Sequence, residues 1–119
     1  MNKTNYDHHQ ASQLVPLLRS ITREMRERTH AVEHLEAKLR DARRAGPDSE
    51  AFLSVQAELS TQKRELRLAR KELERLGCAL DDSHPLRVLI PGQDGELRSG
   101  FEYTIGSNSV EPNGADSAV

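Results

Sequence analysis

Two stripes of apolar residues most constrain what this chain can fold into. In each stripe the apolar residues recur at alternating spacings of three and four, the heptad period of helices that pack along one seam. Arg28 interrupts the first stripe and Gln62 interrupts the second. The apolar members are Leu14, Leu18, Ile21, Met25, Val32, Leu35, Leu39 and Ala42, followed by Phe52, Val55, Leu59, Leu66, Ala69, Leu73 and Leu76.

The segment between the stripes reverses the chain. Gly46-Pro47-Asp48-Ser49 supplies a helix stop, a rigid turn and a new helix cap. Folding the chain antiparallel about this turn pairs residues whose numbers add up to 94, such as Leu35 with Leu59. Because one register satisfies both stripes, the sequence predicts an antiparallel two-helix coiled-coil hairpin over residues 7–77, with helices at about 8–45 and 49–76.

The two polar seam residues occupy adjacent layers of this register. Arg28 and Gln62 lie on opposite helices without sharing a layer, so we expect each to be partly buried. The guanidinium of Arg28 is expected to reach solvent or a flanking carboxylate, with Glu24 and Glu65 as the candidates. Such a polar layer lowers stability and often specifies register and partner number.

The first helix carries clear start and break signals. Asp7 and Gln10 have the spacing of a capping box, which predicts a helix start near His8 after a flexible N-terminus over residues 1–6. Pro16 lacks an N–H group and crowds the preceding turn, so a kink or a short separate first helix is expected.

The period changes after Gly77. Residues 85–90 and 101–105 are typical of strands, and residues 91–95 of a turn, so we expect a small β-hairpin within residues 78–106. Residues 107–119 are small, polar and rich in helix and strand breakers, which predicts a disordered tail. The fold class is therefore mainly α: a coiled-coil hairpin with a Pro-kinked N-terminal turn and a small C-terminal β-hairpin.

Several short segments follow a pattern that is known from other sequences: Tyr6-Asp7, Ala11, Leu14-Val15-Pro16-Leu17-Leu18, Leu76-Gly77-Cys78, Pro91 and Gly95. With them the chain resembles an uncharacterised bacterial family of small proteins with two long helices and a C-terminal β-hairpin segment, a domain of unknown function. Tyr103-Thr104-Ile105-Gly106 falls where that family has a segment ending in Trp-x-Leu-Gly-Glu, so Tyr103 stands at the family's Trp, and Leu89-Ile90 stands where the family has Asp-Phe before a proline. The resemblance covers roughly residues 6–106, and no activity follows from it.

Composition excludes several classes of protein. The 119 residues are 30% charged and only 3% aromatic, which suits long solvated helices better than a large enzyme core. The formal net charge of −2 indicates no general affinity for nucleic acid or an anionic membrane. No apolar run approaches the length of a membrane span, and no signal peptide is evident, so we expect a cytoplasmic protein.

Two features have the residue types of chemical sites. His30, Glu33 and His34 spell H-x-x-E-H, a zinc-protease motif, but the register places them away from the partner helix, so we expect a solvated helix face. Cys78 has no second cysteine and no neighbouring histidine, so we expect a buried small residue. We assign no catalytic, metal or cofactor-binding residue and expect no cofactor, leaving open a chemical role for either feature.

A non-enzymatic role in binding another protein or a second copy is the expected function. Weaker apolar positions outside the seam would be covered by association into a four-helix bundle, at Leu17, Ala31, Leu53, Ala57 and Leu68. One alternative is a nucleic-acid accessory factor that uses the basic residues of the second helix, Lys63, Arg64, Arg67, Arg70, Lys71 and Arg75. A metal-dependent hydrolase is the remaining alternative. The partner, the pathway and the oligomer order do not follow from the sequence.

Overall fold

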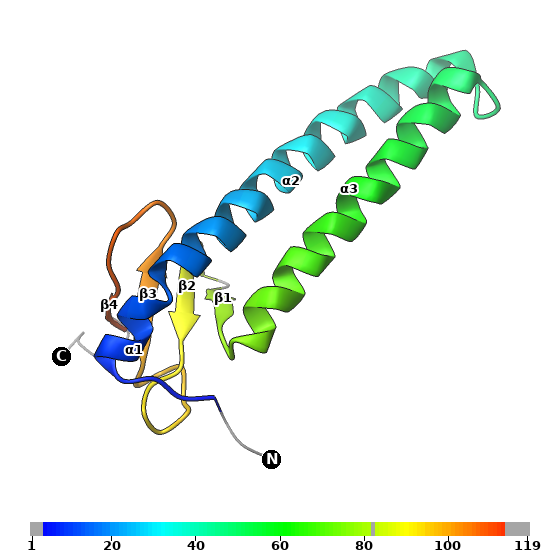
Figure 1. Cartoon of the computed structure of the whole chain (residues 1–119). Coiled ribbons are helices and arrows are strands. Elements are labelled where there is room, and N and C mark those ends of the chain that lie inside the picture. The colour runs from blue at the N-terminus through cyan, green and yellow to red at the C-terminus, as the bar shows by residue number, and fades with distance from the viewer. Residues whose placement is uncertain (1–3, 82, 114–119) are drawn as a thin grey trace. The chain divides into compact units, whose positions relative to one another are not determined.

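A computed structural model describes residues 4–81 and 83–113 and confirms the mainly α architecture, with two long packed helices followed by a small antiparallel sheet (Figure 1). The helical elements are α1 (His8–Gln13), α2 (Val15–Ala42), a 3-10 turn (Arg43–Ala45) and α3 (Glu50–Arg75). The strands are β1 (Ala79–Asp81), β2 (His84–Ile90), β3 (Phe101–Thr104) and β4 (Glu111–Pro112).

The first helix starts and breaks where the sequence predicts. Asp7 is the N-cap of α1: its carboxylate accepts from the Gln10 backbone N–H at 2.7 Å, and the Gln10 side chain accepts from the Asp7 N–H at 2.9 Å. The helix stops at Leu14, so that Pro16 lies in the first turn of α2. A proline is tolerated there because the first turn needs no N–H donor.

The chain divides into two compact units, which are described separately. The hairpin unit is Glu24–Arg70, the central part of the two long helices and the turn between them. The sheet unit contains the remaining residues, up to Arg23 and from Lys71 onward, and holds the sheet together with α1.

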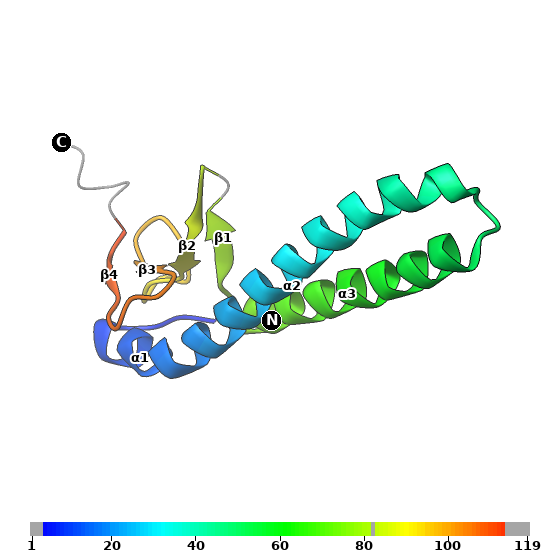
Figure 2. The same ribbon diagram turned by 90° about the horizontal axis from the view of Figure 1, so that it is seen from above.

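In the hairpin unit α2 and α3 run antiparallel on either side of the predicted turn (Figure 2). Gly46 has φ 102°, a left-handed conformation that a residue with a Cβ adopts only with strain. Ser49 then caps α3, because its Oγ accepts from the Phe52 N–H at 3.1 Å. The buried apolar residues all come from the predicted seam: Met25, Leu35, Leu59 and Ala69.

Arg28 and Gln62 contact each other across the seam. Arg28 Nη1 donates to Gln62 Oε1 at 3.1 Å, and Arg28 Nη2 lies 3.8 Å from Glu24 Oε1. Glu24, one of the two expected candidates, is therefore the carboxylate that flanks Arg28. The direct bond between the polar seam residues was not expected, and it forms because the long arginine side chain spans the step between adjacent layers.

The sheet unit contains four antiparallel strands in the order β1-β2-β3-β4. The predicted hairpin is its centre, where Val88 pairs with Tyr103 and Ile90 with Phe101. Val88, Ile90 and Tyr103 are fully buried. Gly100 precedes β3 at a point of close approach, because a Cβ there would lie 1.9 Å from the Ile90 carbonyl oxygen.

The structure corrects the predicted C-terminal region, because the sheet is wider than a hairpin. β1 pairs with β2, and β4 pairs with β3. Part of the expected disordered tail is thus ordered: Val110 is buried, and the Asn113 N–H and Nδ2 each donate at 3.0 Å, to the carbonyls of Gly100 and Leu97. Residues 114–119 of that tail lie outside the described residues.

The predicted flexible N-terminus is also corrected in part. Residues 1–3 lie outside the described residues, but Asn5 and Tyr6 are bonded to the loop after β2. Asn5 Nδ2 donates to the Gln93 carbonyl at 3.2 Å, and the Tyr6 N–H donates to the Gly92 carbonyl at 3.3 Å. Asn5 and Tyr6 are therefore held against the loop after β2, within the sheet unit.

Replacing both polar seam residues tests the seam. Arg28→Leu with Gln62→Leu is expected to raise the melting temperature, because burying matched apolar side chains is often more favourable than a part-buried polar layer. Thermal unfolding followed by circular dichroism measures the change. A clear fall in melting temperature would show that the Arg28–Gln62 contact is essential and that the seam is wrongly assigned.

Candidate functional site

One face of α3 in the hairpin unit combines exposed apolar side chains with small residues. We call this face the outer stripe, and all its residues are exposed. Leu53 retains 53% and Leu68 47% of its accessible surface, and within the described residues they are the exposed large apolar side chains of the hairpin unit. The outer stripe consists of Leu53, Ala57, Ser60, Thr61, Arg64 and Leu68.

The helix period creates this face. Leu53, Ala57, Thr61, Arg64 and Leu68 follow one another at steps of three and four, so they form a second line along α3 outside the seam. The Thr61 hydroxyl already donates to the Ala57 carbonyl at 3.2 Å within the helix. Covering this side of α3 would therefore leave the Thr61 O–H paired.

The corresponding face of α2 is different in character. His30, Glu33 and His34 lie there, exposed as predicted. Among the described residues no group of three or more His, Cys, Asp or Glu side chains is placed to hold a metal ion. The exposed residues of this face are Arg26, Glu27, His30, Glu33, His34, Arg40 and Asp41.

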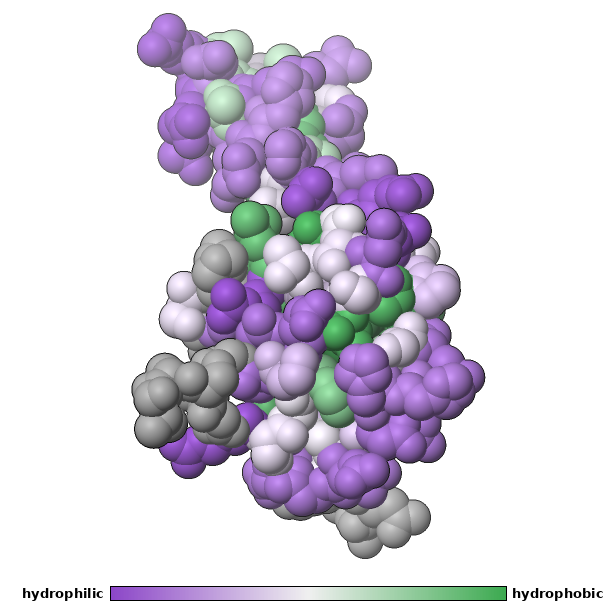
Figure 3. All heavy atoms as spheres, turned by 90° about the vertical axis from the view of Figure 1, so that its left-hand side faces the viewer, coloured by the Kyte–Doolittle hydropathy of each residue, from purple (hydrophilic) through white to green (hydrophobic). Residues whose placement is uncertain are grey.

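Of the five apolar positions predicted outside the seam, four are exposed and Ala31 is half-buried. Leu17, which retains 44% of its accessible surface, belongs to the sheet unit. Leu86 of the same unit retains 47%, and its exposure was not predicted. On the face in Figure 3, hydrophobic residues are exposed only in small groups among hydrophilic ones.

No helix in the described part of the chain is both long and apolar enough to cross a membrane.

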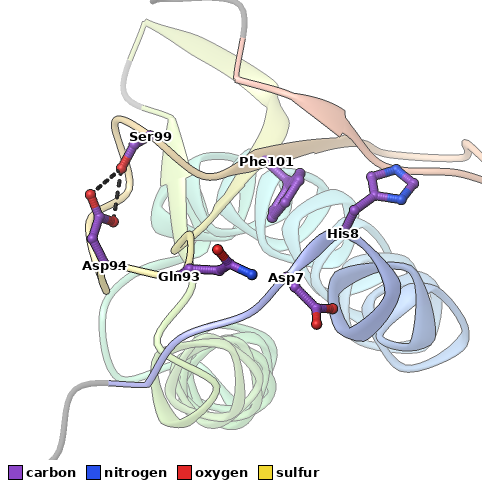
Figure 4. A pocket seen from close by; sticks show the side chains of 6 residues that line it. All are labelled: Asp7, His8, Gln93, Asp94, Ser99 and Phe101. Atoms are coloured by element: carbon purple, nitrogen blue, oxygen red, sulfur yellow. Dashed lines mark hydrogen bonds between the residues drawn. The ribbon is translucent and has the colours of Figure 1, made fainter.

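The sheet unit contains an open hollow of about 500 Å³ (Figure 4). Its lining brings together the start of α1, the loop after β2 and the start of β3. The lining residues are Asp7, His8, Gln93, Asp94, Ser99 and Phe101. The sequence offered no signal for this hollow, because its three segments are far apart along the chain.

Two of the polar side chains that line the hollow bond to each other, and a third caps a helix. Ser99 Oγ lies 2.8 and 2.6 Å from the two Asp94 carboxylate oxygens, and Asp7 caps α1. The His8 ring packs edge-on against Phe101 with 5.6 Å between the centroids. In Figure 4 Phe101 stands between His8 and Ser99, so His8 is not placed to activate the serine hydroxyl.

Charged side chains on the sheet form a compact ion-pair group. Arg87 of β2 lies between two acids on neighbouring strands, with Nη1 3.8 Å from Asp81 Oδ2 and Nε 3.4 Å from Glu102 Oε2. Pairs of this kind hold neighbouring strands in register.

Cys78 follows α3 in the interior of the sheet unit. It is buried, as predicted, and burial raises the pKa of its thiol to about 12. The nearby Tyr6 hydroxyl donates to the Leu76 carbonyl at 2.8 Å, and burial raises the pKa of Tyr6 as well. A thiol with so high a pKa is a poor nucleophile at neutral pH.

Residues 5–97 match DUF2203, a family described as an uncharacterized conserved protein. The chain belongs to this family. The match confirms the expected resemblance, and it includes α1, α2, α3, β1 and β2, and with them the outer stripe. Tyr103–Gly106, which belong to the expected resemblance, lie beyond the matched residues. No curated protein and no solved structure matches this DUF2203 chain.

Ionisation of Cys78 is expected to destabilise the fold at high pH. The unfolded chain loses the thiol proton near the ordinary pKa of 9.0, whereas the folded chain keeps it up to about 12. The folded state thus binds more protons in this window, and the free energy of unfolding falls as pH rises through it. Urea denaturation at several pH values should show a steeper fall for the wild type than for Cys78→Ala. Equal slopes would mean that Cys78 is accessible to solvent.

Proposed function

We propose that this DUF2203 protein is a non-enzymatic helical interaction module, and that the outer stripe of α3 binds a helix of a protein partner. The exposure of Leu53 and Leu68 on one face of α3 carries the proposal. A helix that packs along this face would remove both leucines from water and could approach closely over the short side chains between them. The charged outer face of α2 lacks this combination.

The shallow core of the hairpin unit supports association with a further helix, but its half-buried seam residues lie on another side of α3 than the outer stripe. Only its four buried seam residues, all in the described range 24–70, are well shielded from water. The seam residues on either side of them stay half-buried, for example Val32, Leu39, Val55 and Leu66. Two helices alone cannot surround a seam, and a further helix would bury more of this apolar surface.

The middle of the outer stripe permits a close approach. Ala57, Ser60 and Thr61 have short side chains, so another helix can pack near the α3 backbone there. The leucines at both ends can then fill the space beside the partner. Short side chains between larger apolar ones are a common basis for helix packing by ridges and grooves.

The alternative of a nucleic-acid accessory factor rests on a specific observation. Arg64, Arg67 and Arg70 are exposed on α3 and form no ion pair in the described part of the chain, whereas Lys63 lies 3.9 Å from Glu36. Binding of this kind would weaken steeply with salt and would depend on the arginines. A low-salt gel shift that survives Leu53→Glu but not Arg64→Ala with Arg67→Ala would favour this alternative.

Charges placed on the outer stripe are expected to abolish binding. Leu53→Glu with Leu68→Glu should weaken association with a partner or with itself roughly 100-fold or more, because each half-exposed leucine contributes about 1 kcal/mol when fully buried and carboxylates resist desolvation. Affinity capture from the native cell and sedimentation equilibrium of the purified protein measure the two kinds of association.

Leu17→Glu is the matched control: Leu17 was also expected to be covered by association, but it lies in the sheet unit, outside the outer stripe, and retains 44% of its accessible surface. It should leave binding unchanged, and circular dichroism should show all variants folded. The proposed function fails if the wild type binds neither itself nor any protein, or if the stripe variant binds as well as Leu17→Glu.

A further inference from the structure

We infer that the occupant of the outer stripe is the outer stripe of a second copy of this chain, with the two α3 helices antiparallel and a twofold axis near Ser60 and Thr61. This inference rests on the proposed function and names its partner. It concerns the central part of α3 alone, from Leu53 to Leu68, which lies within the hairpin unit.

The residue order of the stripe is self-complementary. In an antiparallel pair centred between Ser60 and Thr61, Leu53 of one copy faces Leu68 of the other, and the reverse contact follows from the twofold symmetry. The two exposed leucines thus cover each other at both ends of the pair. The small residues Ser60 and Thr61 meet at the centre, where the helices approach most closely.

Charge favours this orientation over a parallel one. In a parallel pair Arg64 would face Arg64 of the second copy within the contact. In the antiparallel pair Arg64 faces Ala57 instead, and the two arginines are seven residues apart along the axis, about 10 Å at the helical rise. That separation is close to the Debye length at physiological salt, so their repulsion is largely screened.

Two polar side chains of the stripe, Thr61 and Arg64, suit burial at an interface. Arg64 is the charged residue within it, and its long side chain can keep the guanidinium in water beside Ala57. The Thr61 hydroxyl is paired within its own helix. Covering the stripe therefore leaves Thr61 paired and the Arg64 charge hydrated.

The size of the stripe predicts a weak dimer. Four helical turns, about 24 Å long, form a contact well below the area of a standard protein interface. Such a dimer dissociates on dilution, so covalent trapping is a more direct probe than size alone.

Disulfide trapping tests the pairing. Ser60→Cys keeps both leucines and places a thiol beside the twofold axis, where two facing Cα atoms come within disulfide range. Under mild oxidation this variant should form a covalent dimer roughly tenfold or more faster than Leu17→Cys, because pairing raises the local thiol concentration. The wild type measures the background from Cys78, which is buried.

Orientation is tested by mixing two further variants. An equimolar mixture of Leu53→Cys and Leu68→Cys should give mixed disulfide dimers faster than either variant gives its own dimer. Faster self-dimers of each variant would indicate a parallel pair and overturn the antiparallel arrangement.

Failure of self-pairing differs from failure of the proposed function. If Ser60→Cys cross-links no faster than Leu17→Cys, the second copy is not the occupant, and this inference is wrong. The interaction function then stands only if the wild type captures another protein that the Leu53→Glu, Leu68→Glu variant loses. If that capture is also absent, both proposals are wrong.

Discussion

The packed seam between α2 and α3 is the interaction on which the hairpin unit depends. Two polar contacts cross this seam, one between Arg28 and Gln62 and the other between Glu36 and Lys63. Each contact is offset slightly from the residue pairs of the predicted register, and the two offsets run in opposite directions. Since the seam uses one side of each helix, its register also decides which residues point outward. The same register that buries Leu35 and Leu59 therefore exposes Leu53 and Leu68. Fold and proposed binding face are consequences of one periodic pattern.

Elements controlled by local interactions could be predicted from the sequence. The Asp7 capping box, the helix break before Pro16 and the Ser49 cap depend on residues within one or two turns of each other. β1 and β4 could not be predicted, because strands of three and two residues are too short to show a period. β4 and Asn113 are ordered through distant partners, as the bonds from Asn113 to Gly100 and Leu97 show.

Part of the candidate site could also be predicted from the sequence, and part could not. The outer stripe could be predicted because apolar residues outside the a and d positions stand out in a charged helix. The Arg28–Gln62 bond was missed because facing layers were considered without the reach of the arginine side chain. The hollow at Asp7 and Asp94 depends on the packing of three separate segments, which no spacing in the sequence reveals. Within the hollow Asp94 pairs with Ser99 in the loop after β2, and Asp7 caps α1.

Nuclear Overhauser contacts between side-chain methyl groups in dilute protein would test the seam register most directly. The account predicts strong contacts between the methyl groups of Leu35 and Leu59. A register shifted by one heptad would instead bring Leu35 next to Phe52 or Leu66. Contacts of that kind, without the Leu35–Leu59 contact, would contradict the register.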